Sequence, residues 1–349
     1  SIKETDREIV RLLNQRAGMS LEIGRIKAEL DMEIYDPSQE SGIYENVMEV
    51  NGCDLPSKSL RVIFREIISA SRVLQSPVTV AYLGPEASFT HLAAQSHFGA
   101  SSQLFSQPSI SSVFAEVEKE KLKWGVVPVE NSLEGSVNLT LDRLIATPLK
   151  IRAEIFLRIS HCLLTRHNRM KDIETVYSHP QALAQCQAWL RANLSQAAVM
   201  EMESTAAAAQ RVVKDGKGAA IGSRSAAIIY GLDILSEGIE DNSSNTTRFL
   251  VIGEGEGKPS GNDKTSLLFA TPHTPGALYS TLQPFAERRI NMMKIESYPV
   301  KDRLWEYLFF VDVAGHGKDE EIKQCLDGLR QKTSFLKILG SYPCSEGAR

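Results

Sequence analysis

No stretch of the sequence is apolar over the roughly 18 residues that a helix needs to cross a bilayer. Neither sign of charge dominates, since the sequence has 39 basic and 43 acidic side chains, and no long basic run occurs. Both absences argue against nucleic acid or an anionic membrane as the main partner. Residues 1–27 alternate charged and apolar side chains, without the unbroken apolar core of a signal peptide. We therefore expect a cytoplasmic protein.

Cysteine is scarce and follows no motif. The five cysteines are odd in number, form no CxxC pair and lie near no histidine at the spacing of zinc ligands. We therefore expect reduced structural thiols and no metal site. The cysteines are Cys53, Cys162, Cys186, Cys325 and Cys344.

The chain of 349 residues is too long for one ordinary core, and its 42% hydrophobic and 23% charged residues are typical of a globular protein. Its pattern changes twice along its length. Residues 1–76 have the pattern of helices, residues 77–253 of alternating strands and helices, and residues 264–349 of both kinds of element. Residues 254–263 are rich in glycine and charge, which predicts a linker. We expect three domains with these bounds.

Three helices are predicted at the start of the chain. Apolar residues recur at helical spacing over residues 2–30. A second helix begins at Asp36-Pro37, because proline is favoured in a first turn, and it ends near residue 51. A third helix covers residues 57–75. Three helices of unequal length cannot bury their apolar stripes alone, so we expect a dimer that shares one core.

Between residues 77 and 253, a short β-rich run is followed by a Gly/Pro turn and a helix, several times over. This order is the signature of an α/β fold. Ligands in such folds gather at the carboxyl ends of the strands. The β-rich runs occupy residues 78–82, 124–127, 175–177 and 219–221, the second of them ending before Pro128.

Polar side chains follow these predicted strands. Residues 84–90 (GPEASFT) place the hydroxyls of Ser88 and Thr90 where a strand gives way to a helix, and free N–H groups there bind carboxylates and phosphates. Taken singly, such hydroxyls are more often simple helix caps. Further polar clusters occur at residues 130–134, 223–224 and 245–248. Four clusters at strand ends predict a ligand cleft.

Five motifs in this region resemble the prephenate dehydratase family in order and spacing: GPEASFT, PVENSLEGSV, HPQALAQC, AAIGSRSAA and NTTRF. The resemblance covers residues 78–252. It implies two α/β lobes, like those of periplasmic binding proteins, with the active site between them and no cofactor or metal. It also implies the conversion of prephenate to phenylpyruvate, with Thr247 as the catalytic residue.

Prephenate carries two carboxylates and a ring hydroxyl, and losing CO2 and water together makes its ring aromatic. The protein must therefore hold the carboxylates and help the hydroxyl leave. We expect Arg248 to bind a carboxylate bidentately and Thr247 to hydrogen-bond the leaving hydroxyl. Glu130 is either an acid or a cap and salt-bridge residue, and His179 is expected to position other groups. Neutral donors are expected from Ser88, Thr90, Asn131 and Ser132.

Helical spacing also places charged side chains of the first region on shared faces. Arg16 and Lys27 are eleven residues apart, close to three turns, so that both can lean toward a dianion between them. On their own, such residues are usually surface charges. The segments LLNQRAGMSLEIGRIKAE, YDPSQE and SRVLQ, however, resemble the all-helical chorismate mutase family. By that resemblance the chorismate-binding residues are Arg16, Lys27, Asp36, Gln39, Glu40, Ser71 and Gln75.

The mutase reaction is a pericyclic rearrangement, which needs the folded conformer of chorismate and a stabilised negative charge on the breaking ether oxygen. Lys27 and Gln75 suit the ether oxygen, and Arg16 suits a carboxylate. Two departures from the family predict a weakened mutase. Gln39 stands where the family usually has arginine, and the arginine that the family lends to the partner's site would lie ahead of Ser1. The alternative is a dehydratase whose helices only dimerise.

After the linker, the sequence predicts strand, helix, two strands, helix and strand, the order of a ferredoxin-like α+β module. The strands are expected at residues 266–270, 291–297 and 305–313 and near residue 336. The helices are expected from residue 275 on and at residues 319–329. The motifs TPGAL, IESYP and WEYLFFVD resemble an ACT domain fused to a dehydratase. The resemblance implies pairing across a dimer and L-phenylalanine as the effector. The phenylalanine-binding residues would be Gly276, Ala277, Leu278, Glu296 and Ser297.

Tyr298 stands where that family usually has arginine, which predicts an altered response to phenylalanine, whereas Trp305 and Phe309 are expected in the core. The combined interpretation is a multidomain homodimer or homotetramer that takes chorismate and prephenate as substrates. A non-catalytic binding protein is the rival from another class, because a two-lobed cleft also serves solute receptors. The Thr247-Arg248 pair argues against that rival.

Overall fold

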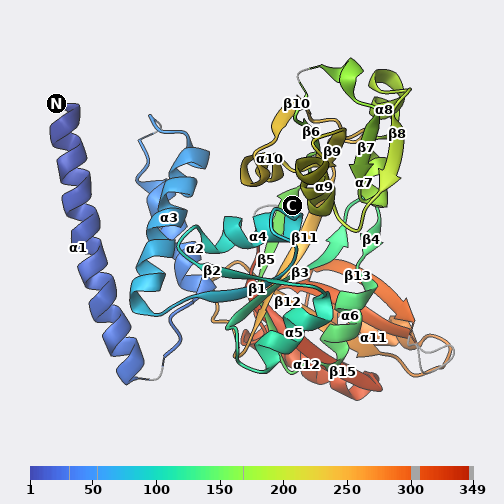
Figure 1. The fold of residues 1–349 in the computed structure, drawn as a ribbon. Coiled ribbons are helices and arrows are strands. Elements are labelled where there is room, and N and C mark those ends of the chain that lie inside the picture. The colour runs from blue at the N-terminus through green and yellow to red at the C-terminus, as the bar shows by residue number, and fades with distance from the viewer. Residues whose placement is uncertain (31, 53, 168, 300–306, 346–349) are drawn as a thin grey trace.

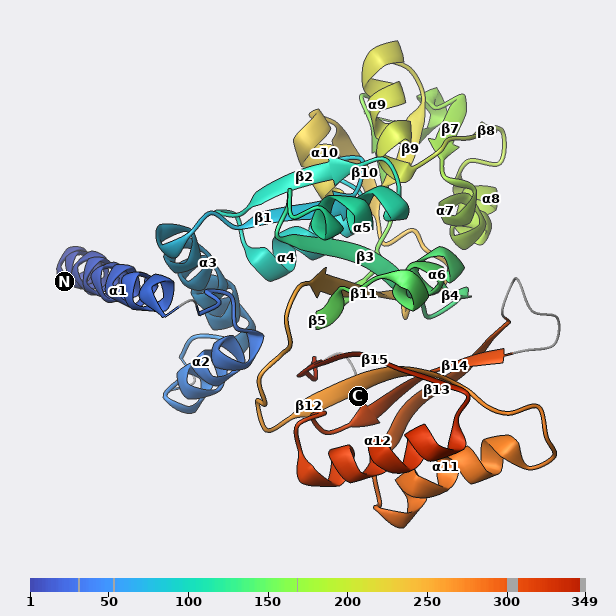
Figure 2. The same cartoon turned by 90° about the horizontal axis from the view of Figure 1, so that it is seen from below.

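The computed structural model describes residues 1–30, 32–52, 54–167, 169–299 and 307–345, so that Cys53 and Trp305 lie outside the described residues. Helices begin the chain, two α/β lobes follow, and an α+β layer ends it (Figures 1 and 2). This order confirms the expected fold class.

The first region consists of α1 (Ile2–Glu29), α2 (Pro37–Glu49) and α3 (Ser57–Gln75), as predicted. Asp36 caps α2, because its carboxylate accepts from the N–H groups of Ser38 and Gln39. Helix α1 stands at the edge of the molecule and packs on α3 (Figure 1). Its apolar side chains are largely exposed within one chain, namely Ile2, Ile9, Val10, Leu12, Leu13, Met19, Leu21, Ile23 and Ile26.

The first lobe contains a sheet in the order β2-β1-β3-β11-β5, with β11 antiparallel to both neighbours. Helices α4 (Phe89–Phe98), α5 (Ile110–Glu118) and α6 (Asn138–Ala146) pack against it, and β4 (Gly135–Ser136) pairs with β3. The strands are β1 (Thr79–Leu83), β2 (Gln103–Gln107), β3 (Trp124–Asn131), β5 (Lys150–Arg158) and β11 (Thr246–Gly253).

The second lobe has its own sheet, in the order β10-β6-β9-β7-β8. The chain enters this lobe after β5 and leaves it before β11, so two crossing segments join the lobes. The strands are β6 (Cys162–Thr165), β7 (Thr175–Ser178), β8 (Ala198–Glu201), β9 (Ala219–Gly222) and β10 (Asp233–Glu237). The helices are α7 (Pro180–Gln185), α8 (Gln187–Asn193), α9 (Thr205–Asp215) and α10 (Arg224–Tyr230), with a short 3-10 turn at Met170–Asp172.

Strand β3 does not end before Pro128, as the sequence suggested, but runs through it to Asn131. The register with β11 shifts here, since Phe249 pairs with Pro128 whereas Arg248 pairs with Glu130. Proline is tolerated in a strand at such a bulge, where a ladder hydrogen bond is missing anyway. The longer strand brings Asn131 directly opposite Thr247.

The C-terminal layer has the predicted βαββαβ order and a four-stranded sheet in the order β13-β14-β12-β15. Its helices cover one face, and the other face lies on the first lobe (Figure 2). The two sheets share one hydrophobic cluster, in which Leu268, Phe310 and Leu339 meet Val127 and Leu250. The elements are β12 (Asp263–Ala270), α11 (Ala277–Glu287), β13 (Met292–Pro299), β14 (Tyr307–Ala314), α12 (Glu320–Lys332) and β15 (Phe335–Pro343).

The helical region is anchored to the first lobe by Tyr35, which is 2% exposed and belongs to a core cluster of that lobe. Its ring meets Trp124 edge-on, with 4.6 Å between the ring centroids. Its hydroxyl lies 2.5 Å from Nε2 of His97. Burial raises the pKa of Tyr35, so the hydroxyl donates and the imidazole accepts.

Burial, helped by the nearby Arg72 cation, lowers the pKa of His97 to about 3 from its ordinary 6.5. The unfolded chain therefore takes up a proton first as the pH falls, and folding stability is lost between about pH 6.5 and about pH 3. In that window His97 should contribute a slope of at most ~1.4 kcal/mol per pH unit to the free energy of unfolding.

His97→Gln keeps an acceptor for Tyr35 but cannot titrate, so its free energy of unfolding should fall less steeply with decreasing pH. Denaturant titrations at about pH 7 and about pH 4.5 measure the difference. His273→Gln, at an exposed histidine, is the matched control and should follow the wild type. Identical pH slopes for wild type and His97→Gln would contradict the assignment.

Candidate active sites

A cavity of about 770 Å³ lies between the two lobes. The first lobe contributes the loop after β1 together with the end of β3 and the start of β11, and the second lobe contributes the starts of α7 and α9. Two longer helices begin at its wall, because Ser88 caps α4 from one lobe and Ser204 caps α9 from the other. The cavity therefore offers two positive helix ends to a small anionic ligand.

The loop after β1 also holds the lobes together. The hydroxyl of Ser223 donates to the carbonyl of Ala87 at 3.1 Å, and the hydroxyl of Tyr230 donates to that of Glu86 at 2.8 Å. Ala87 has a φ of 67°, which is uncommon for a residue with a side chain. In this loop Ser88 uses its hydroxyl twice, since it accepts from the N–H of His91 and donates to the carbonyl of Leu83.

Thr247 faces this cavity from β11, and Asn131 faces it from β3. The side-chain amide of Asn131 donates to Oγ1 of Thr247 at 2.9 Å and to Oδ1 of Asn245 at 2.8 Å. Because the hydroxyl of Thr247 accepts from Asn131, its own proton remains available to a ligand. Accepting one hydrogen bond also makes a hydroxyl a stronger donor.

The hydrogen-bond chain continues into the second lobe through Gln185. Its carbonyl accepts from Asn245 at 2.9 Å and lies 3.0 Å from Nε2 of His161. Burial lowers the pKa of His161, so its imidazole is neutral and Nε2 donates to Gln185. The chain fixes the orientation of the amide next to Thr247. Sequence reasoning missed His161, which lies in a crossing segment without any turn or cap signal.

Four of the predicted dehydratase residues line the cavity, and three do not. Thr247, Asn131, Ser88 and Thr90 line it, as does His179, whose ring caps α7.

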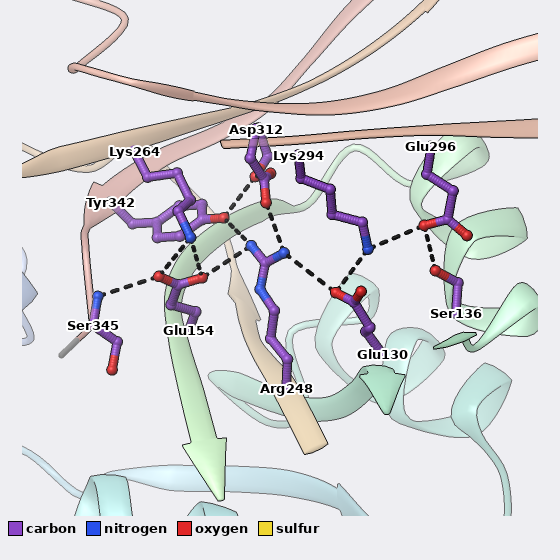
Figure 3. A network of polar contacts seen from close by, with 11 residues as sticks. Glu130, Ser136, Glu154, Arg248, Lys264, Lys294, Glu296, Asp312, Tyr342 and Ser345 are labelled. Carbon is purple, nitrogen blue, oxygen red and sulfur yellow. Dashed lines mark hydrogen bonds and ion pairs between the residues drawn. The ribbon is translucent and has the colours of Figure 1, made fainter. Parts of the chain in front are cut away.

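Arg248 and Glu130 point to the opposite face of the sheet, because neighbouring residues of a strand alternate in direction. There Arg248 lies 2.6 Å from Asp312, and Glu130 lies 2.7 Å from Lys294 (Figure 3). Their expected placement at the substrate is therefore corrected.

Ser132 is also placed away from the cavity, because it is exposed beyond the end of β3. Its hydroxyl accepts from the N–H of Thr246 at 3.0 Å. That contact closes the turn after β3 against the start of β11, so the side chain belongs to a turn and is not aimed at a ligand.

The residues expected to bind chorismate lie on α1, α2 and α3 and at the cap of α2. The guanidinium of Arg16 donates to the hydroxyl of Ser71. Nζ of Lys27 donates to the carbonyl of Ile34 at 3.2 Å and to Oε1 of Gln39 at 3.4 Å. The structure thus pairs side chains that are 55 and 12 positions apart in the sequence.

Two acidic residues of the same group are paired with cations from elsewhere. Glu40 lies 3.2 Å from Arg72, and burial raises its pKa. Asp36 lies 2.9 Å from Nζ of Lys258, which comes from the segment between β11 and β12. Burial lowers the pKa of Lys27, and Asp36 opposes this effect. No sequence signal points to Lys258, because it is about 220 residues from its partner.

The residues of the expected phenylalanine site do not all face the same way, because neighbouring side chains of β13 point to opposite faces of the sheet. Gly276 begins α11 with a φ of 78°, a left-handed conformation that favours glycine, and Ala277 and Leu278 form the first turn. Ser297 is exposed. Glu296, in contrast, faces the first lobe, where it contacts Ser136 and Lys294.

Tyr298 follows the direction of Glu296. It is buried, and its hydroxyl donates to Asp142 on α6. Phe309 stacks on Phe269 with 5.4 Å between their ring centroids, beside the core of the layer, as expected. Tyr298 therefore joins the C-terminal sheet to the first lobe and does not reach toward Gly276.

Within the described residues, no group of three or more acidic, histidine or cysteine side chains is arranged to hold a metal ion. A membrane-crossing helix is likewise absent from this part of the chain.

Comparisons with known proteins agree with the three regions. Family profiles match in order: chorismate mutase type II over residues 1–76, prephenate dehydratase over residues 80–257, and the ACT domain over residues 265–331. A bifunctional chorismate mutase/prephenate dehydratase of Aquifex aeolicus (strain VF5) is 45% identical over 346 residues, which cover 98% of this chain and 96% of that protein.

Two solved structures are similar over most of the chain. A prephenate dehydratase from Arthrobacter aurescens, in complex with L-Phe, is 34% identical with a TM-score of 0.71, covering 76% of this chain and 90% of that one. A protein described as a quorum quenching acylase, GqqA, is 29% identical with a TM-score of 0.71, covering 77% of this chain and 99% of that one. Because one fold carries different activities, the site and the full-length match must decide the function.

Proposed function

Since the chain belongs to the bifunctional chorismate mutase/prephenate dehydratase family, we propose that it performs both reactions in phenylalanine biosynthesis. It rearranges chorismate to prephenate and converts prephenate to phenylpyruvate, under feedback control by L-phenylalanine. The observation that carries the dehydratase assignment is the Thr247 hydroxyl, which accepts from Asn131 and keeps its proton for a ligand in the cavity between the lobes.

In the dehydratase step, the electrons of the breaking C–CO2⁻ bond enter the ring and the hydroxyl on the opposite ring carbon leaves. Thr247 donates a hydrogen bond to that hydroxyl, which takes up one proton from solvent as its C–O bond breaks and departs as water. The two carboxylates are held by the helix ends at Ser88 and Ser204, which line the cavity, because the first N–H groups of a helix have no partner within the helix. Most of the driving force is the aromaticity gained by the substrate, so positioning is the main task of the protein.

The proposed dehydratase site therefore comprises Thr247, Asn131, Ser88 and Thr90. Gln185 on α7 of the second lobe, together with Asn245 and His161 in the crossing segments, holds the Asn131 amide in place. Of the two interpretations of Glu130, its 2.7 Å contact with Lys294 favours the salt-bridge residue.

For the mutase step, Lys27 and Gln75 act on the ether oxygen and Arg16 on a carboxylate, with Asp36, Glu40 and Ser71 completing the site. Gln39 leaves this site one cation short of the usual family pattern. Lys258 brings an ammonium group to Asp36, next to Lys27, and so restores positive charge at this point.

The proposed assembly is a homo-oligomer, which the exposed apolar side chains of α1 support. The proposed domains are residues 1–76, 77–253 and 264–349, and phenylalanine binds near Gly276 and Ser297. A cytoplasmic location is in keeping with the buried, unbridged thiols of Cys162, Cys186 and Cys325. Sedimentation as a single chain at micromolar concentration would contradict the assembly.

The decisive test is phenylpyruvate formation by the purified chain from prephenate and, separately, from chorismate, with and without phenylalanine. Turnover of both substrates, with the prephenate reaction suppressed by phenylalanine, is expected. Turnover of prephenate alone would leave a dehydratase whose helices only dimerise. Binding of prephenate without turnover by the folded protein would instead establish the binding-protein alternative.

A further inference from the structure

A buried network of charges joins the first lobe to the C-terminal sheet, with Arg248 at its centre (Figure 3). Nη2 of Arg248 lies 2.9 Å from Glu154 on β5, and Nη1 lies 2.6 Å from Asp312 on β14. The side chains of these three residues are 5%, 0% and 1% exposed. One guanidinium therefore binds a carboxylate from each side of the domain boundary.

Each strand of the C-terminal sheet contributes a polar side chain to this network. Lys264 on β12 lies 2.9 Å from Glu154, and the hydroxyl of Tyr342 on β15 accepts from Arg248 at 3.0 Å. Lys294 on β13 continues the network at one side, where it contacts Glu130 at 2.7 Å and Glu296 at 3.0 Å. The network thus spans the sheet from edge to edge (Figure 3).

Charges at this place are not what stability alone requires. The surrounding interface is hydrophobic, and replacing a buried ion pair by well-packed apolar residues often leaves stability unchanged or increased. Removing a single partner, in contrast, leaves an uncompensated buried charge. Burial opposes the charge on Arg248, but Tyr342, Asp312 and Glu154 raise its pKa above the ordinary value, so the cation is permanent. Such a network constrains the relative position of two surfaces.

The surface that it constrains is the back of the dehydratase site. Thr247 pairs with Asn131 across the two strands, and the next pair along the ladder is Arg248 with Glu130. The first pair faces the cavity and forms a hydrogen bond, whereas the second pair faces the C-terminal sheet and forms ion pairs with it. A single peptide unit on each strand separates the two pairs.

We propose that Arg248 and Glu130 are positioning residues, which fix the Thr247–Asn131 pair to the C-terminal sheet and carry the state of that sheet to the dehydratase site. The proposal rests on the proposed function and assigns the path of its regulation. A shift of Asp312 and Lys294 pulls on two adjacent strands at the positions directly behind the catalytic hydroxyl. By linkage, the same contacts make phenylalanine affinity depend on the occupant of the cavity.

Asp312→Asn tests the path from the regulatory side, because Asp312 is not among the residues that line the cavity and its replacement preserves shape while removing charge. We expect kcat for prephenate to fall about fivefold while KM changes less than about twofold, since the substitution displaces Thr247 but leaves the groups that bind prephenate in place. Phenylalanine should bind with a Kd within about threefold of wild type, yet inhibit the reaction at least about tenfold less effectively. If Asp312 only stabilised the fold, the substitution would not weaken inhibition by phenylalanine while leaving phenylalanine binding unchanged.

Lys337→Met is the matched control. Lys337 on β15 also crosses the domain boundary, where its ammonium donates to the carbonyls of Leu144, Ile145 and Thr147 at the end of α6, without touching β3 or β11. This variant should keep the kcat and the phenylalanine response of the wild type. Tyr342→Phe, which removes only one hydroxyl from Arg248, is a milder second variant in case Asp312→Asn does not fold.

Hydrogen exchange of the β11 amides gives a readout that needs no turnover. Phenylalanine should change exchange in residues 246–250 of the wild type, but not of Asp312→Asn. Unchanged inhibition in both Asp312→Asn and Tyr342→Phe, or equal loss in Lys337→Met, would overturn the proposal. Failure of the wild type to turn over prephenate would instead remove the proposed function. The hydrogen-exchange experiment would then test the proposed path on its own. If phenylalanine does not change exchange in β11 of the wild type, the path is refuted.

Discussion

Replacing Thr247 by alanine should lower kcat for phenylpyruvate formation by about 10²–10³-fold, with KM for prephenate changed less than about threefold. Thr247 is 9% exposed and faces the cavity, where its hydroxyl accepts from Asn131. The alanine variant loses the donor to the leaving hydroxyl but keeps both helix ends that hold the carboxylates. The loss therefore appears in the transition state and hardly in substrate binding. Steady-state formation of phenylpyruvate measures both constants.

Two further variants sharpen this experiment. Thr247→Ser retains the hydroxyl and should recover most of kcat. Thr246→Ala removes the neighbouring hydroxyl, which donates to the carbonyl of Ser244 and lies outside the cavity lining, so it should behave as wild type. If Thr247→Ala and Thr246→Ala show the same kcat, Thr247 does not act on the leaving group.

Lys27→Met should lower the mutase kcat by about 10²–10³-fold, the second large effect expected here. Lys27 is 9% exposed, and its ammonium is held by the carbonyl of Ile34 and by Gln39. Methionine preserves the length and apolar stem of the side chain but supplies no charge to the breaking ether bond. Disappearance of chorismate, followed by its ultraviolet absorbance, measures the loss.

The second activity of the same protein is the internal control for this variant. Lys27→Met should convert prephenate to phenylpyruvate at the wild-type rate, and Thr247→Ala should rearrange chorismate at the wild-type rate. This reciprocal pattern distinguishes a lost catalytic group from a damaged fold. Wild-type mutase activity in Lys27→Met would show that the Lys27 ammonium does not act on the breaking ether bond.

Much of the fold could be predicted because its signals are local. Helical periodicity placed α1 and α3, the proline after Asp36 placed the start of α2, and the alternation of strands and helices gave the order of the C-terminal layer. The end of β3 was misjudged for an equally local reason: proline usually breaks a strand, and only the register with β11 reveals the bulge that accommodates Pro128.

The site was predicted where a motif coincides with a strand end and missed where partners are distant in sequence. NTTRF brought Thr247 and Arg248 to notice together, yet adjacent residues of a strand face opposite ways, so they cannot both meet one substrate. The role of Arg248 depends on Asp312, which is 64 residues away on another sheet. No periodicity or turn signal reports such a pairing, and the same is true of His161 and Gln185.

Residues 254–263 have a further consequence for how the gene can be divided. Arg152 holds the carbonyl of Glu254 and the carboxylate of Glu33 together, and a Cβ on Gly255 would come within 2.5 Å of that carboxylate. The segment is therefore fitted to the helical region and brings Lys258 to it. Produced as a separate polypeptide, residues 1–76 would lose this lysine from Asp36. The mutase and dehydratase regions are thus not independent units, because Asp36 of the helical region pairs with Lys258, which follows the dehydratase region in the sequence.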